Sequence, residues 1–335
     1  AGAATFNSSV TATSLDISGD IDVDGTTNLD VLDVDGAVNF AADVTFADGA
    51  DIITASAGTS NFRAGVNAGN SIQSGGNYNV AVGDEAGTNL TTGDSNTLIG
   101  YLAGEDLVEG GNNVAIGYET MKNEDGHGKN TAVGTQALFS LNAGTDALNV
   151  AVGFQAGAGM TTGTNNTLIG SLAGDAITTG TVNVSVGTAA LGSLTTASYN
   201  TALGYAALTT NVTGAQNTAV GYSALTLATG ADNTAVGSQA LSSVAAGTYN
   251  TAVGRSAGAA VTTGIENVLI GGLAGDALTD ADYNIAVGKA ALTSDTLGSR
   301  STAIGHGALS TQNFTSATDT YNTAVGYKAG VEITT

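Results

Sequence analysis

The feature that most constrains this chain is a repeat of about 17 residues that fills most of its length. Each copy opens with an asparagine and a short segment of the Thr-Ala-Val-Gly type. Self-similarity at a fixed short period predicts a stack of identical structural units instead of several globular domains. Fifteen copies begin at Asn79, Asn96, Asn113, Asn130, Asn149, Asn166, Asn183, Asn200, Asn217, Asn233, Asn250, Asn267, Asn284, Ser301 and Asn322, and Asn61 begins a degenerate sixteenth.

Each copy is interpreted as one coil. The opening segment predicts one strand, the Ala-Leu pair that follows it, as at Ala137-Leu138, predicts a second short strand, and Thr91-Thr92-Gly93 is typical of a turn. Two strands cannot form a closed globule, so neighbouring coils must stack in parallel at about 4.8 Å per coil, giving a rod roughly 70 Å long. The predicted fold is an all-β parallel β-solenoid or β-roll of about fifteen 17-residue coils.

The two faces of the predicted strand differ in bulk. In Asn217–Gly221 the second and fourth residues are Thr and Val, whereas the others are Asn, Ala and Gly. Side chains alternate between the faces of a strand, so we predict a Val/Ile interior and an Ala/Gly outer face. Such a minimal outer face indicates close approach of other copies of the chain, and we therefore predict a homo-oligomer.

The composition and net charge argue against several kinds of site and binding partner. There is no cysteine, which excludes disulfides, thiolate metal sites and cysteine nucleophiles. The net charge of −22, from 29 acidic and 7 basic residues, argues against nucleic acid and anionic membranes as partners. No stretch approaches the roughly 18 apolar residues of a membrane span, so no membrane insertion is expected.

The first 58 residues differ from the rest in charge and in residue pattern. They carry ten aspartates, no basic residue, and short runs in which apolar and polar residues alternate. We predict an acidic β-strand shaft or connector over residues 1–58 and the repetitive β-solenoid over 59–335. The spacing of Asp20, Asp22 and Asp24 resembles half of a calcium loop, but Val31 stands where such a loop has Glu. A solvated strand is the favoured interpretation, with calcium as the alternative and no other cofactor expected.

Two family resemblances follow from the repeat. Asn217-Thr-Ala-Val-Gly-Tyr-Ser-Ala-Leu225 resembles the head repeats of trimeric autotransporter adhesins, and the likeness covers about residues 61–335. It implies a homotrimeric left-handed parallel β-roll, although the adhesin repeats are commonly a few residues shorter. The Thr161-Thr162-Gly163 type of turn, and the run from Ile17 to Leu29, are similar to tail-fibre proteins of marine-type bacteriophages.

All ten tyrosines fall at two positions of the repeat, directly before the asparagine or directly after the strand glycine. The pairs Tyr101 with Tyr118 and Tyr205 with Tyr222 are one coil apart, so we predict that they stack about 5 Å apart along the rod. Such rings are candidate platforms for sugars. Ordinary packing at the coil corners is the favoured interpretation.

Three irregular segments are further candidates for recognition, because function concentrates on loops carried by a rigid scaffold. Residues 119–129 gather charges around His127, whereas the turns at 139–147 and 310–320 are longer and contain Phe139 and Phe314, which we expect to be exposed. Simple tolerance of insertions is the favoured interpretation of the two longer turns.

No catalytic signature is present. The two histidines, His127 and His306, are about ten coils apart, and no Ser-His-Asp set or phosphate loop occurs. The sequence predicts a structural and adhesive fibre subunit of a virion tail and not an enzyme. Its expected partners are copies of itself, other virion or fibre proteins, and a host-surface glycan or protein. Alternatives are an extracellular bacterial adhesin or filament at the cell surface, and a fibre with glycan-depolymerase activity.

Overall fold

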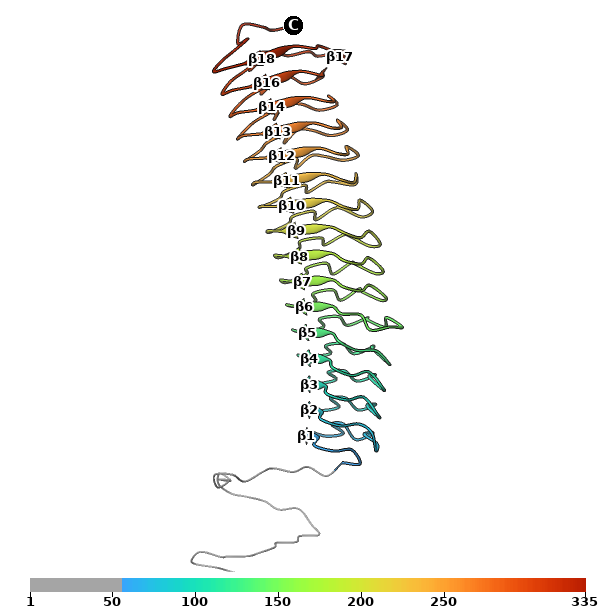
Figure 1. The fold of residues 1–335 in the computed structure, drawn as a ribbon. Helices are drawn as coiled ribbons and strands as arrows, with labels where there is room; N and C mark the ends of the chain where they lie inside the picture. Colours follow the sequence, from blue (N-terminus) through green and yellow to red (C-terminus); the bar gives the residue numbers. More distant parts are fainter. Residues whose placement is uncertain (1–55) are drawn as a thin grey trace, which may run out of the picture. The chain divides into compact units, whose positions relative to one another are not determined.

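A computed structural model describes residues 56–335. The predicted shaft segment up to residue 55 and the calcium candidates Asp20, Asp22 and Asp24 lie outside the described residues. Over 56–335 the chain forms strands and turns without a helix, and successive coils rise as a single stack (Figure 1). The predicted all-β parallel β-solenoid is confirmed.

Sixteen strands form one continuous parallel sheet, in chain order, along the stack. Neighbouring strands pair residue for residue, as Thr218 does with Thr234. A second sheet of two strands, β15 and β17, lies near the C-terminal end of the stack. The strands are β1 (Phe62–Ala64), β2 (Val80–Val82), β3 (Thr97–Ile99), β4 (Val114–Ile116), β5 (Thr131–Val133), β6 (Val150–Val152), β7 (Thr167–Ile169), β8 (Val184–Val186), β9 (Thr201–Leu203), β10 (Thr218–Val220), β11 (Thr234–Val236), β12 (Thr251–Val253), β13 (Val268–Ile270), β14 (Ile285–Val287), β15 (Gly298–Ser299), β16 (Thr302–Ile304), β17 (Thr318–Asp319) and β18 (Thr323–Val325).

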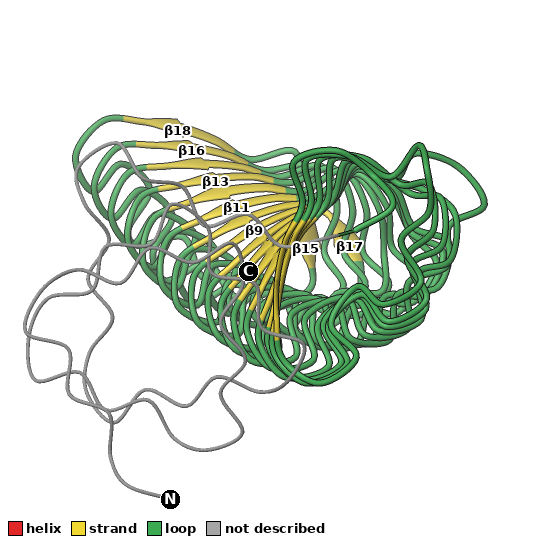
Figure 2. Ribbon diagram, turned by 90° about the horizontal axis from the view of Figure 1, so that it is seen from below, coloured by secondary structure: helices red, strands yellow, loops and turns green. Residues whose placement is uncertain are grey.

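The degenerate copy at Asn61 is a true coil, since β1 pairs with β2 in the register of all the others. The predicted second strand is wrong. The Ala-Leu pair lies in a turn, where Gln136 and Leu138 have φ angles of 57° and 50°. These left-handed residues bend the chain back on itself, which an extended strand cannot do within so few residues. Figure 2 shows the result: the strands of the sixteen-stranded sheet lie on one side of the stack, and turns, with the short β15 and β17, make up the rest.

The predicted assignment of the two strand faces is also wrong. Ala219 is fully buried, whereas its neighbours Thr218 and Val220 are partly exposed, and the same pattern recurs along the sheet. The interior of so thin a coil holds a buried asparagine and a small strand residue together with the apolar side chains of the turns. It has no room for two β-branched rows as well. The Val/Ile face therefore points outward.

Small residues face the neighbouring coil of the same chain, and not another copy. A Cβ on Gly221 would lie 2.7 Å from both the carbonyl carbon and the oxygen of Gly237, one coil further on. The φ of Gly221 is +135°, a conformation that side chains rarely adopt. The close backbone approach that the sequence predicts between copies is therefore made inside one chain.

A ladder of buried asparagines runs through the interior. The Oδ1 of Asn217 accepts a hydrogen bond from the backbone N–H of Asn233 (3.0 Å), and the Asn217 Nδ2 donates to the carbonyl of Gly230 (2.9 Å). Asn233 repeats both contacts with Asn250 and Gly247. The bond from the N–H of one coil to the Oδ1 of the preceding coil is unbroken from Asn61 to Ser301. Each side chain thus satisfies buried backbone groups that water cannot reach.

A leucine at the inward strand position is accompanied by glycine at a turn position, so the side-chain volume in the core stays similar from coil to coil. In three coils the inward strand residue is a leucine, Leu98, Leu168 or Leu269. In those coils, and in the coil before each, the turn position that carries leucine in most other coils is glycine. The atoms nearest to a Cβ on Gly104 would be those of the Leu98 side chain, the closest at 2.9 Å. The strand leucine therefore fills the space that turn leucines occupy in other coils, as interior packing density requires.

The ladder predicts a large effect of Asn233→Ala. This change leaves the buried N–H of Asn250 and the carbonyl of Gly247 without the partners that Asn233 provides. Each buried group that is left unsatisfied costs about 1–3 kcal/mol, so we expect a loss of roughly 3 kcal/mol in the free energy of unfolding, measured by denaturant titration. Tyr249→Ala, at a site 60% exposed in the same coil, is the control. A loss below about 1 kcal/mol for Asn233→Ala would contradict a structural role for the ladder.

The volume compensation predicts coupling between Leu98 and Gly104. Leu98→Ala alone should cost about 3 kcal/mol through the cavity that it leaves, and Gly104→Leu alone about 2 kcal/mol through overpacking. The double variant recreates the Ala-and-Leu arrangement of the coil that contains Ala132 and Leu138. We expect it to lose at least about 1 kcal/mol less than the sum of the single losses. Strictly additive losses in urea unfolding would show that the two positions do not share one space.

Candidate functional site

The outward face of the main sheet runs the length of the stack. Each strand from β1 to β18 that belongs to this sheet presents its first and third residues outward. The third residue is aliphatic in every one of these strands, and none of the outward residues is charged. Val236, Val253 and Ile270, on three successive strands, are 37%, 38% and 39% exposed. This surface, the outer sheet face, is thus an uncharged strip, mainly of aliphatic and threonine side chains, on a chain whose net charge is −22.

Tyrosine pairs adjoin the C-terminal ends of the strands. The rings of Tyr101 and Tyr118 are 5.5 Å apart between centroids, and those of Tyr205 and Tyr222 are 5.6 Å apart. Both pairs are stacked, which confirms the spacing predicted from the repeat. All four side chains are about half exposed, so each pair leaves ring surface open to solvent. Whether these surfaces take part in recognition stays a prediction.

Sequence comparison of the repeat positions missed two further aromatic contacts. His306 stacks on Tyr327 with centroids 5.5 Å apart. His306 follows its strand glycine just as Tyr327 does, so the same alignment could have found this pair. At the other tyrosine position, directly before the first residue of a coil, the Arg300 guanidinium lies 4.5 Å from the ring centre of Tyr283. Arg300 also pairs with Asp319 at 3.0 Å, and this hydrogen-bonded carboxylate raises the pKa of Arg300.

The two phenylalanines predicted as exposed contacts are only partly exposed. Phe139 and Phe314 are both half-buried. The backbone of Phe314 is held in the last turns, where its N–H donates to Asp295 Oδ1 at 2.9 Å and its carbonyl accepts from Leu297. The backbone of Phe139 is held in the same way, since its carbonyl accepts from the N–H of Asn123 in the neighbouring coil. The structure does not bring Phe139 and Phe314 together with the tyrosine pairs.

The turn at residues 119–129 contains a residue that sequence analysis missed. Glu124 occupies the position eleven residues after the coil asparagine. Other coils place Leu90, Leu107, Leu141 or Met160 there, all fully buried. Glu124 is buried as completely as they are, so a carboxylate stands in an aliphatic core position. Aligning the repeat at this position is the signal that could have found it.

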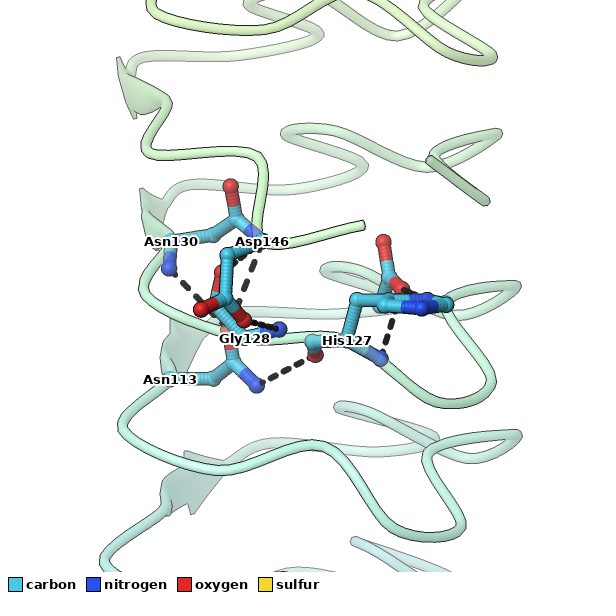
Figure 3. Close-up of polar contacts among 6 residues, drawn as sticks. Asn113, His127, Gly128, Asn130 and Asp146 are labelled. Atoms are coloured by element: carbon cyan, nitrogen blue, oxygen red, sulfur yellow. Dashed lines mark hydrogen bonds and ion pairs between the residues drawn. The ribbon is translucent and has the colours of Figure 1, made fainter. Parts of the chain in front are cut away.

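Glu124 lies beside two other metal-ligating side chains. One ligand atom from each of Glu124, Asp125 and His127 lies within 4.8 Å of the others. The N–H of His127 donates to Glu124 Oε1 at 3.2 Å, while the carbonyl of His127 accepts from Asn113 Nδ2 at 3.1 Å. Figure 3 shows His127 held on the ladder side by Asn113, and Gly128 held by Asp146. A pocket of about 440 Å³ opens here, lined by Val108, Glu109, Asp125, Gly126 and His127.

The buried and the exposed carboxylate at this turn differ in how they are paired. Burial raises the pKa of Glu124, with hydrogen bonds to backbone N–H groups opposing that shift. Glu124 Oε2 and His127 Nδ1 are buried atoms without a hydrogen-bond partner. Nearby, the ammonium of Lys129 lies 2.6 Å from Asp146, and this hydrogen bond lowers the pKa of the Asp146 carboxyl. The exposed carboxylate is thus paired, whereas the buried one lacks a partner for one of its oxygens.

Other polar residues at the same core position have hydrogen-bond partners. Asn211 donates to and accepts from Gly214. Asp295 accepts from the N–H groups of Gly298 and Phe314 and from the side chain of Gln312. Among the described residues at this position, Glu124 therefore differs from its counterparts in having a buried oxygen without a partner.

Comparisons with known proteins add no name to this geometry: no protein-family model, curated protein or solved structure matches the chain. The described residues include no helix long and apolar enough to cross a membrane.

The stacked tyrosines predict a small but measurable coupling. Replacing Tyr205 and Tyr222 by alanine, singly and together, should give a coupling free energy of about 0.5 kcal/mol, because exposed aromatic pairs lie at the low end of such contacts. Tyr205 and Tyr249 occupy the two different tyrosine positions of the repeat. They form the control pair and should show no coupling free energy. The measurement is the free energy of unfolding of each variant. Equal coupling in both pairs would mean that stacking contributes nothing specific.

Proposed function

We propose that this chain is a structural subunit of an extended fibre, which associates with copies of itself through the outer sheet face. The observation that carries the proposal is the uncharged strip along the whole sheet, in which one row of outward residues is aliphatic in every strand. Monomeric proteins rarely leave so long an apolar surface in contact with water. The strip runs along the rod axis, so its partner must also be long and apolar.

A second copy of the chain meets that requirement. Identical rods placed side by side in parallel share the same coil spacing, so each strand faces an equivalent row of Val, Ile or Thr on its neighbour. Sixteen strands at about 4.8 Å, each three residues wide, present a face of about 750 Å². That area is close to the roughly 800 Å² that a standard stable interface buries on each partner, and in a trimer the face would be shared between two neighbours. The like charges of the copies remain outside this face.

The surface that carries the association differs from the one predicted from sequence. Ala and Gly are used inside each coil, so the small-residue argument no longer supports an oligomer. The outward Val and Ile now support it instead. A homotrimer is the expected form, because the repeat resembles trimeric adhesin heads.

The place of such a fibre is proposed from the same resemblance. A virion tail fibre with a rigid rod and a host-contact surface is the first choice, given the long Thr-Thr-Gly turns and the acidic N-terminal run. A bacterial surface adhesin or extracellular filament is the alternative. The half-exposed tyrosine pairs are the surface that we propose for contact with host glycans, since aromatic rings offer flat apolar platforms.

Light scattering after size exclusion tests the association. We expect a particle of three times the 32.5 kDa chain mass. The double variant Val236→Glu and Val253→Glu places two charges in the outer sheet face, and we expect it to elute as a monomer because buried unpaired charges are costly. Ala246→Glu, in an exposed turn of the same region, is the control and should remain associated. A monomeric native chain, or an associated double variant, would contradict the proposal.

A further inference from the structure

The turn at residues 124–127 is built around a carboxylate that folding alone does not explain. A buried carboxylate without full pairing is costly, and an aliphatic residue of similar size is usually better for stability. Most coils place an aliphatic residue at this position. A polar residue retained there against stability indicates a ligand that supplies the missing charge.

We propose that Glu124, Asp125 and His127 bind one divalent metal ion of the zinc class. Their ligand atoms lie within 4.8 Å of one another. In a tetrahedral site, ligand atoms about 2.0–2.2 Å from a zinc ion are about 3.4 Å apart, so side-chain rotations that move the ligand atoms by about 1 Å bring these three together. The fully buried Glu124 Oε2 and the buried His127 Nδ1, both without a hydrogen bond, are the atoms that an ion would satisfy.

The ligand set selects the kind of ion. An imidazole with carboxylates suits zinc and neighbouring transition metals, whereas calcium takes oxygen ligands. Three protein ligands leave one position of a tetrahedral site for water or another group. Glu109, from the preceding coil, lines the same pocket. The site is thus open on one side.

The backbone that carries these ligands is held in place by both neighbouring coils. The carbonyl of Asp125 accepts from the N–H of Val108, the carbonyl of His127 accepts from Asn113, and the N–H of Gly128 donates to Asp146. A metal site needs ligands whose positions are fixed before the ion arrives. The hydrogen bonds of the solenoid supply that rigidity here (Figure 3).

Zinc uptake by the full chain tests the proposal. Equilibrium dialysis against zinc chloride in 0.15 M sodium chloride, with metal quantified per chain, should show one tight equivalent above the weak binding of surface acids. Glu124→Leu, which restores the aliphatic core residue, and His127→Asn should each weaken that equivalent by at least about tenfold. His306→Asn and Asp295→Asn, matched in residue type and in repeat position respectively, should retain it.

Stability measurements separate loss of the site from loss of the fold. In the presence of a chelator, Glu124→Leu should unfold at the same temperature as the native chain or higher, because it removes a buried carboxylate. Zinc should raise the unfolding temperature of the native chain and leave that of Glu124→Leu unchanged. The proposal is overturned if the native chain takes up no more zinc than Glu124→Leu, or if His127→Asn binds zinc as tightly as the native chain does.

Discussion

Every coil in this structure must repeat the one before it after a shift of a single strand spacing, and the asparagine ladder enforces that shift. The Oδ1 of one asparagine accepts from the backbone of the next, from Asn61 to Ser301. A change in the register of one coil would leave buried groups unpaired on both sides of it. The absence of proline from the chain fits this constraint, because a proline would remove a backbone donor from the stack.

Coils differ in length and in sequence only where the asparagine ladder and the sheet register are preserved. The steps of 16, 19 and 21 residues between successive asparagines leave the sheet register intact, since β10 pairs with β11, β5 with β6 and β16 with β18 in the common alignment. The additional residues lie in turns away from the main sheet. Where Ser301 replaces the asparagine, Gln312 donates to its hydroxyl and Asn322 donates in turn to Gln312. A side-chain network thus replaces the missing amide at the end of the stack.

The proposed association and the proposed metal site use different parts of the coil and rest on separate observations. The outer sheet face is uniform, and its significance lies in repetition along the rod. The Glu124 turn differs from the others, because among the polar residues described at this core position Glu124 has a buried oxygen without a partner. In a repeat protein the shared positions define the architecture, so such a departure is the place to look for a specific ligand.

The sequence by itself determined the architecture. The period predicted the parallel stack, the coil boundaries and the tyrosine spacing, because each depends only on distance along a repeating chain. Only the tertiary structure decided which way the residues face. Val220 points outward and Ala219 inward because the thin interior must also hold the asparagine and the turn leucines. Likewise Leu138 bends a turn where a strand was expected, and Glu124 is buried, since both depend on what neighbouring coils place around them.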